Sequence, residues 1–226
     1  MSDRLDVDVW SDVVCPWCAI GVTQFLAAVD SLAGDVDVTL RFMPFELNPD
    51  MGPEGHDQVD LLAKAYNKSA DDVLKMRAHV EEAGDAAGFA MRWQGEGEAP
   101  PLMVWNSHDC HKLLRWALTV AEPVRQVALK LAFFRAYFQQ RRNISDRAVL
   151  LDIAEAEGFD RDAAAMALDD PALSEAVRIE EQRAAHSQIT SVPTMVVAGK
   201  YILQGASPAE QYRQALLQLA SMEAMA

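Results

Sequence analysis

Residues 11–21 read SDVVCPWCAIG, and this stretch contains two of the three cysteines in the 226-residue chain, Cys15 and Cys18. Residues 5–10, just before it, alternate apolar and acidic or aromatic side chains, as in a half-buried strand. Residues 16–32 follow the helical period, and they begin with a proline, which is well suited to the first turn of a helix. The two cysteines are therefore expected at a strand-to-helix junction.

Three interpretations of the cysteine pair compete. Free cysteine behaves as a small apolar residue, so both thiols could be inert parts of the core. A structural zinc site needs four ligands, and the other suggestive candidates, Cys110 and His111, are neighbours that would point about 100° apart on a helix. Thiol–disulfide exchange fits best, because unpaired N–H groups and the helix dipole stabilise a thiolate at Cys15. Cys18 lies one turn on, about 5 Å away, within the reach of a disulfide.

Composition limits the classes of partner. The chain has 20 Lys+Arg against 34 Asp+Glu, and its net charge of −14 would repel nucleic acid and anionic membrane surfaces. We find no apolar run near the roughly 18 residues that a membrane span requires, and no signal-peptide pattern at the start. We expect a cytoplasmic protein, where a CxxC pair more often serves catalysis or metal binding than stability.

The remaining patterns predict one sheet built from both ends of the chain. Residues 36–42 return to the strand period, and a right-handed crossover would make this strand parallel to the first. Residues 57–189 carry one helical pattern after another and no convincing strand. Residues 194–197 and 201–204 then form a predicted hairpin, which is followed by a helix. The economical fold is a four-stranded sheet interrupted by a helical insertion.

These motifs resemble the DsbA family of thiol–disulfide oxidoreductases, specifically its FrnE-like cytoplasmic branch. The matching stretches run nearly from end to end: Val9 to Cys18, Pro44 to Pro49, Asn106 to Ala117, Phe134 to Phe138, Ile144 to Asp146, and Val192 to Thr194. The resemblance implies an α/β protein with the thioredoxin fold and a large all-helical insertion domain. It also implies that Cys15 is the nucleophile, that Cys18 is the resolving thiol, and that a cis peptide bond precedes Pro193.

In this fold the chain would divide into two domains. Residues 1–48 and 170–226 would form the thioredoxin-like domain, and residues 49–169 the helical insertion domain. Because ligands of open α/β sheets bind at the carboxyl ends of the strands, we expect the insertion to form a lid over the cysteine end. Several residues are expected to mark helix N-termini: Ser69, Pro123, Ser145, and Ser207 with Glu210 as a capping box.

Further residues are assigned to the substrate groove by the same resemblance. Pro16 and Trp17 lie between the cysteines, Val192 and Pro193 form the opposing loop, and His111 is placed near the groove. We expect no metal ligands.

Three other side chains have open roles. Glu46 either relays a proton near the sulfurs or acts as a capping or ion-pairing residue. His108 and His111, near the start of a predicted helix, could equally be two partly exposed imidazoles, and the role of His108 stays open. Cys110 is expected to be a free, slowly reacting thiol.

The sequence thus predicts a thiol–disulfide oxidoreductase that uses the CPWC dithiol and needs no metal or organic cofactor. Its partners would be protein or small-molecule thiols and disulfides, with glutathione a candidate substrate or reductant, and it would be a monomer or homodimer. One alternative is a glutathione-dependent isomerase or kappa-class-like transferase, relatives that as a rule carry serine in place of the nucleophilic cysteine. Another is a non-catalytic, chaperone-like binding module. Retention of both cysteines favours redox chemistry.

Overall fold

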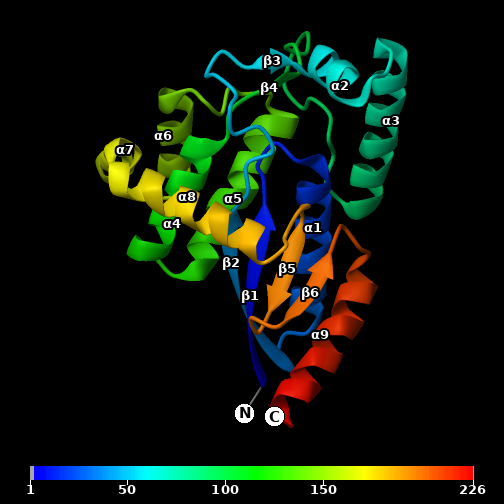
Figure 1. Cartoon of the computed structure of the whole chain (residues 1–226), viewed down its shortest axis with the longest axis vertical. Helices are drawn as coiled ribbons and strands as arrows, with labels where there is room; N and C mark the ends of the chain where they lie inside the picture. Colours follow the sequence, from blue (N-terminus) through cyan, green and yellow to red (C-terminus); the bar gives the residue numbers. More distant parts are fainter. Residues whose placement is uncertain (1–2, 226) are drawn as a thin grey trace.

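The computed structural model describes residues 3–225, and its centre is a four-stranded sheet made from both ends of the chain (Figure 1). The strand order is β2-β1-β5-β6, with bounds β1 Asp3–Ser11, β2 Val36–Pro44, β5 Thr194–Val197 and β6 Tyr201–Gln204. β1 and β2 are parallel, with Val7 opposite Leu40, whereas β1 with β5 and β5 with β6 are antiparallel. The predicted sheet is confirmed.

Helix α1, Pro16–Ser31, makes the crossover from β1 to β2. Side chains alternate between the two faces of β1, and its apolar residues Leu5, Val7 and Val9 are completely buried in the core. Helix α9, Ala209–Ala224, packs beside α1, and the ring of Phe25 meets that of Tyr212 edge-to-face with centroids 5.1 Å apart. Both helices lie together at the β5–β6 side of the sheet in Figure 1.

The chain between β2 and β5 is mainly helical. The helices are α2 Gln58–Tyr66, α3 Ala70–Ala87, α4 His108–Val120, α5 Pro123–Phe134, α6 Arg147–Ala156, α7 Arg161–Asp169 and α8 Pro171–His186, and α5 continues into a π-helical turn, η1 Arg135–Gln139. α4, α5 and α8 pack against β2, whereas α2 and α3 lie beyond the end to which the β1 arrow points (Figure 1). The aromatic cluster of α5 and η1 (Phe133, Phe134, Tyr137, Phe138) is buried. Within residues 3–225 no helix is both long and apolar enough to cross a lipid bilayer.

One short ladder was not predicted. β3, His56–Asp57, pairs antiparallel with β4, Met103–Val104, in the region expected to hold helices alone. Two residues per strand are too few to produce a period-two pattern, so the sequence carries no signal for this ladder. It ties the segment before α2 to the segment before α4.

The predicted helix N-termini of this region are largely correct. Ser69 is the N-cap of α3, and its Oγ accepts the backbone N–H of Asp72 at 3.2 Å. α6 begins one residue later than predicted, because Asp146 is its N-cap and accepts the N–H of Ala148 at 2.8 Å. Ser145 lies just outside the helix.

The predicted capping box of α9 is wrong. Its N-cap is Pro208, not Ser207, and Glu210 is exposed in the first turn. The N–H of Ala209 is instead accepted at 2.8 Å by Oε1 of Gln24, which comes from α1. A cap supplied by another helix depends on tertiary packing and leaves no local sequence pattern.

Candidate active site

The cysteine pair lies where β1 ends and α1 begins. Cys15 is the N-cap of α1, with extended backbone angles, and its sulfur accepts the backbone N–H of Cys18 at 3.4 Å. Pro16 takes the first helical position, where its missing N–H costs nothing. An N–H directed at the sulfur, at the positive end of a 16-residue helix, favours negative charge on Cys15.

The loop before β5 faces this junction. The peptide bond between Val192 and Pro193 is cis, as the family resemblance implied. The thiol of Cys15 contacts the carbonyl oxygen of Val192 at an S···O distance of 3.9 Å. Gly21 permits this approach, because a Cβ at that position would lie 2.8 Å from Cγ of Pro193. Val192 and Pro193, assigned to the groove from the sequence, thus lie beside the first cysteine.

The three thiols are all free but are not equivalent. Cys15 is 5 % exposed, whereas Cys18 and Cys110 have no exposed surface. Burial raises the pKa of the Cys18 thiol well above its ordinary value, and the neighbouring Cys15 sulfur raises it further. Burial also raises the pKa of Cys110, whose Sγ contacts the carbonyl oxygen of Ile144 at 3.6 Å. Cys15 is therefore the thiol best placed to meet a substrate.

Lys130 of α5 brings a positive charge beneath the pair. Its side chain is fully buried, and Nζ donates to the carbonyl oxygen of Ser11 at 3.2 Å. The same ammonium lies 5.5 Å and 5.2 Å from the ring centres of Phe42 and Phe134. Burial lowers the pKa of Lys130, and its charge in turn lowers the pKa of Cys18 against the effect of burial. Sequence reasoning missed this residue.

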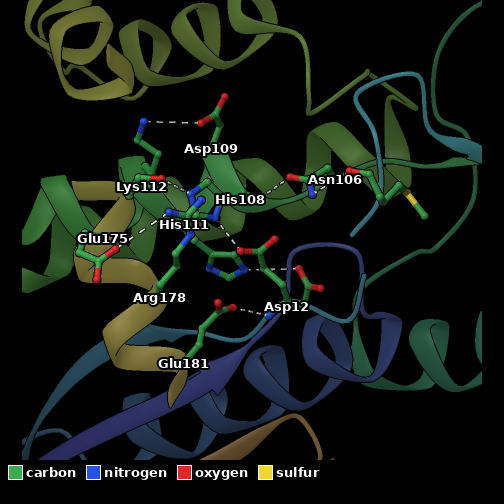
Figure 2. Close-up of polar contacts among 12 residues, drawn as sticks. Asp12, Asn106, His108, Asp109, His111, Lys112, Glu175, Arg178 and Glu181 are labelled. Carbon is green, nitrogen blue, oxygen red and sulfur yellow. Dashed lines mark hydrogen bonds and ion pairs between the residues drawn. The ribbon is translucent and has the colours of Figure 1, made fainter. Parts of the chain in front are cut away.

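Asp12 and His111 complete the buried polar cluster (Figure 2). Nε2 of His111 lies 3.5 Å from Oδ1 of Asp12, whose Oδ2 accepts the N–H of Leu47 at 2.7 Å. Burial acts to raise the pKa of Asp12, but the neighbouring His111 imidazole and the N–H of Leu47 outweigh this effect. The pKa of Asp12 is therefore lowered. Burial lowers the pKa of His111. His111, which was expected near the groove, is 2 % exposed, and its ring lies beside Asp12, three residues before Cys15.

A cleft of about 300 Å³ opens beside Cys15. Its walls are mostly apolar, and the main contributors are Pro16, Trp17, Leu47, Leu62, Tyr66, Met76, Val80, Met91 and Phe138. Trp17 is 39 % exposed, and its ring centroid lies 6.2 Å from that of His79 on α3. Because α2 and α3 form the far wall, the lid expected over the cysteine end is confirmed for these two helices. α4 and α5 pack beside β2 instead, and α6 and α7 pack on these two helices.

A second cavity, of about 550 Å³, lies between the N-terminus of α4 and α8 (Figure 2). Glu46 and His108 form part of its wall, and Oε1 of Glu46 lies 2.6 Å from Nδ1 of His108. The Glu46 carboxylate thus contacts the imidazole of His108, and the Glu46 backbone N–H donates to Glu181 at 2.8 Å. Burial and the Glu46 carboxylate raise the pKa of Glu181 to about 7. Among residues 3–225, no three His, Cys, Asp or Glu side chains are arranged to hold a metal ion.

Similarity to known proteins covers almost the whole chain. Residues 6–217 match the family described as DSBA-like thioredoxin domain. A probable DsbA oxidoreductase from Streptomyces coelicolor is 31 % identical, with 97 % of this chain and 91 % of that chain covered and a TM-score of 0.82.

Two further solved structures share the fold at lower identity. One is a 2-hydroxychromene-2-carboxylate isomerase, 18 % identical, with 97 % of this chain and 98 % of that chain covered and a TM-score of 0.66. The other is the cytosolic disulfide reductase DsbM from Pseudomonas aeruginosa with GSH, 17 % identical, with 95 % and 98 % covered and a TM-score of 0.59.

Proposed function

The chain belongs to the family of DSBA-like thioredoxin domains, and we propose that it is a thiol–disulfide oxidoreductase acting through Cys15 and Cys18. The observation that carries the proposal is that the two cysteines have different environments at the N-terminus of the same helix. Cys15 lines the cleft, and its sulfur accepts the backbone N–H of Cys18. Cys18 lies one helical turn further along α1 and is fully buried. Such a pair can separate the attack on a substrate from the release of the product.

In the first step the Cys15 thiolate attacks one sulfur of a substrate disulfide. The Cys15–substrate S–S bond forms, the substrate disulfide breaks, and the second substrate sulfur leaves as a thiolate that takes up a proton. Val192 and Pro193 would lie against the bound substrate, because the Val192 carbonyl is already in contact with the Cys15 sulfur.

In the second step Cys18 resolves the mixed disulfide. Its thiol loses a proton and attacks the Cys15 sulfur, so that Cys15 and Cys18 become oxidised while the substrate leaves as a dithiol, reduced by two electrons. Lys130 supports this step, because its ammonium stabilises the Cys18 thiolate in a site from which water is excluded. The reverse sequence oxidises a substrate dithiol.

The cleft favours disulfides that are flanked by apolar groups. Its charged members, Arg77 and Glu81, form an ion pair with each other at 3.3 Å, so that apolar side chains dominate the remaining wall. Glutathione is a candidate small-molecule partner or reductant, since a protein of the same fold has been solved with GSH.

Cysteine variants separate this proposal from its alternatives. With a peptide disulfide as substrate and a thiol reductant, Cys15→Ser and Cys18→Ser should both lose turnover, whereas Cys110→Ser, which removes a thiol outside the pair, should retain it. An isomerase or transferase, suggested by the shared fold with 2-hydroxychromene-2-carboxylate isomerase, would tolerate Cys18→Ser. A binding module that uses the apolar cleft alone would tolerate loss of both cysteines. Full turnover by Cys15→Ser would refute the proposal.

A further inference from the structure

A second reactive arrangement lies away from the cysteine pair, at the N-terminus of α4. The imidazole of His108 is held between two side chains: Nδ1 is 2.6 Å from Oε1 of Glu46, and Nε2 is 2.6 Å from Oγ of Ser174. An ionised carboxylate can only accept a hydrogen bond, so Nδ1 carries the proton and donates to Glu46. In the neutral imidazole Nε2 is then the acceptor, and it receives the hydroxyl proton of Ser174. The three side chains form an acid, base and nucleophile in series.

We propose that Ser174 and His108, with Glu46 orienting the imidazole, form a serine-nucleophile site that hydrolyses small carboxylic esters. This activity is separate from the proposed thiol–disulfide exchange and does not depend on it. A nucleophile within hydrogen-bond reach of a base, with the base oriented by a third group, is the geometry by which such sites are recognised on unrelated folds.

Burial supports the role of each member. The Glu46 side chain is 4 % exposed, so the carboxylate is shielded from water and holds the imidazole in one orientation. The His108 side chain is 21 % exposed, so its ring remains partly accessible. Ser174 is half-buried in the first turn of α8, where the helix dipole favours negative charge on the attacking oxygen.

His108, whose Nε2 meets Ser174, is part of the wall of the cavity of about 550 Å³, which provides room for a small substrate next to this contact; Ser174 itself is not one of the lining residues. Arg178 lies one helical turn after Ser174 and is part of the cavity wall. Its guanidinium contacts Glu175 only at 4.0 Å and is 63 % exposed, so it is free to approach the oxyanion of an acyl intermediate.

The remaining wall restricts the class of substrate. The cavity wall contains Arg178 and four carboxylate side chains, those of Glu46, Asp50, Asp109 and Glu181. This excess of carboxylates repels anionic esters, so the site suits neutral or cationic ones.

The reaction is balanced without a cofactor. Oγ of Ser174 attacks the ester carbonyl and passes its proton to Nε2 of His108, and the alcohol leaves with that proton, giving a Ser174 acyl ester. Water then attacks this ester with His108 again taking the proton, which His108 returns to Oγ of Ser174 as the carboxylic acid is released.

The test uses a fluorophosphonate probe, whose phosphorus bonds to Oγ of an activated serine as fluoride leaves. We expect labelling of the Cys15→Ser/Cys18→Ser protein, located at Ser174 by peptide mass spectrometry. Labelling should disappear in Ser174→Ala and persist in Ser187→Ala, the matched control, because Ser187 is an exposed serine at the other end of α8.

Ester turnover gives a second readout in the same Cys15→Ser/Cys18→Ser background. With p-nitrophenyl acetate, Ser174→Ala should lower the rate by about 10²-fold or more. Glu46→Gln should lower kcat with KM unchanged, because only the orientation of His108 is lost. Absence of labelling in the folded protein, or equal labelling and turnover in Ser174→Ala, would overturn the site. Neither result would bear on disulfide exchange, which the cysteine variants test separately.

Discussion

Cys15 and Cys18 differ in environment although one helical turn separates them. Cys15 borders the cleft, and its sulfur accepts a backbone N–H, whereas Cys18 is fully buried and burial raises its pKa well above the ordinary value. With a limiting amount of iodoacetamide at pH 7, we therefore expect carboxamidomethylation of Cys15 well before Cys18. Peptide mass spectrometry would measure the order. Cys110, equally buried, is the internal control and should remain unmodified; equal labelling of the pair would contradict the assignment.

His111 should contribute to the pH dependence of stability. Burial lowers its pKa below the ordinary 6.5, so below that pH the unfolded chain binds a proton that the folded protein takes up only at a lower pH. Its contribution to the free energy of unfolding is therefore present above pH 6.5 and is lost as the pH falls toward the folded pKa. Between pH 7 and pH 5, wild type should lose more stability than His111→Gln.

Urea unfolding at several pH values would measure this difference. His56→Gln is the matched control, because the His56 side chain is exposed, and it should follow the wild-type pH dependence. Parallel curves for wild type and His111→Gln would show that the buried imidazole does not titrate as described.

The sequence indicated the residues that we propose to react but not their electrostatic surroundings. Cys15, Cys18 and Pro193 stand in short motifs whose chemistry depends on local spacing. Asp12 and Lys130 carry no such signal, because a single charged residue in an apolar pattern does not reveal where its side chain ends. Their positions follow from packing between segments far apart in the sequence.

One side chain of α5 links the helical region to the edge of the sheet by hydrogen bonds. β2 is an edge strand, and Gln126 takes the place of a neighbouring strand: Oε1 accepts the N–H of Phe42 at 2.7 Å. Nε2 donates to the carbonyl oxygens of Phe42 and Leu114, both at 3.0 Å. The buried amide therefore satisfies backbone groups that would otherwise have no strand beside them.

Gln126→Ala should consequently be costly. Leaving the buried N–H and C=O of Phe42 unpaired should lower the free energy of unfolding by about 2–4 kcal/mol. Equilibrium urea denaturation measures it. Gln214→Ala, an exposed glutamine of α9 that contacts Glu210, is the control and should change stability by about 0.5 kcal/mol or less. An equally small change for Gln126→Ala would mean that water or another group replaces the amide.

Elements with strong local signals were predicted well, and those fixed by packing were not. α5 begins at Pro123 and α3 follows Ser69, because proline and serine act within a single turn. The β3–β4 ladder is too short to show a period, and α9 is capped by Gln24 from another helix. These features depend on contacts that no local pattern contains.

The net charge of −14 acts on the whole molecule. A field of this sign should speed the approach of cationic disulfides and slow that of anionic ones. We expect the reduced protein to react with cystamine faster than with dithiodiglycolate by about tenfold at low salt, once each rate is divided by that of the same disulfide with 2-mercaptoethanol. Stopped-flow kinetics would measure it. The ratio should fall in 0.5 M NaCl because salt screens the field, and a ratio independent of salt would exclude steering.

The central claim is that Cys15 attacks and Cys18 resolves. The most direct measurement is the capture of a mixed disulfide by each single-cysteine variant, with a peptide disulfide as substrate and intact-mass spectrometry as readout. We expect Cys18→Ser to accumulate an adduct of one peptide per protein, attached at Cys15, because the resolving thiol is missing. Cys15→Ser should form none. An adduct on Cys18 in Cys15→Ser, or a Cys18→Ser protein that remains unmodified, would contradict the account.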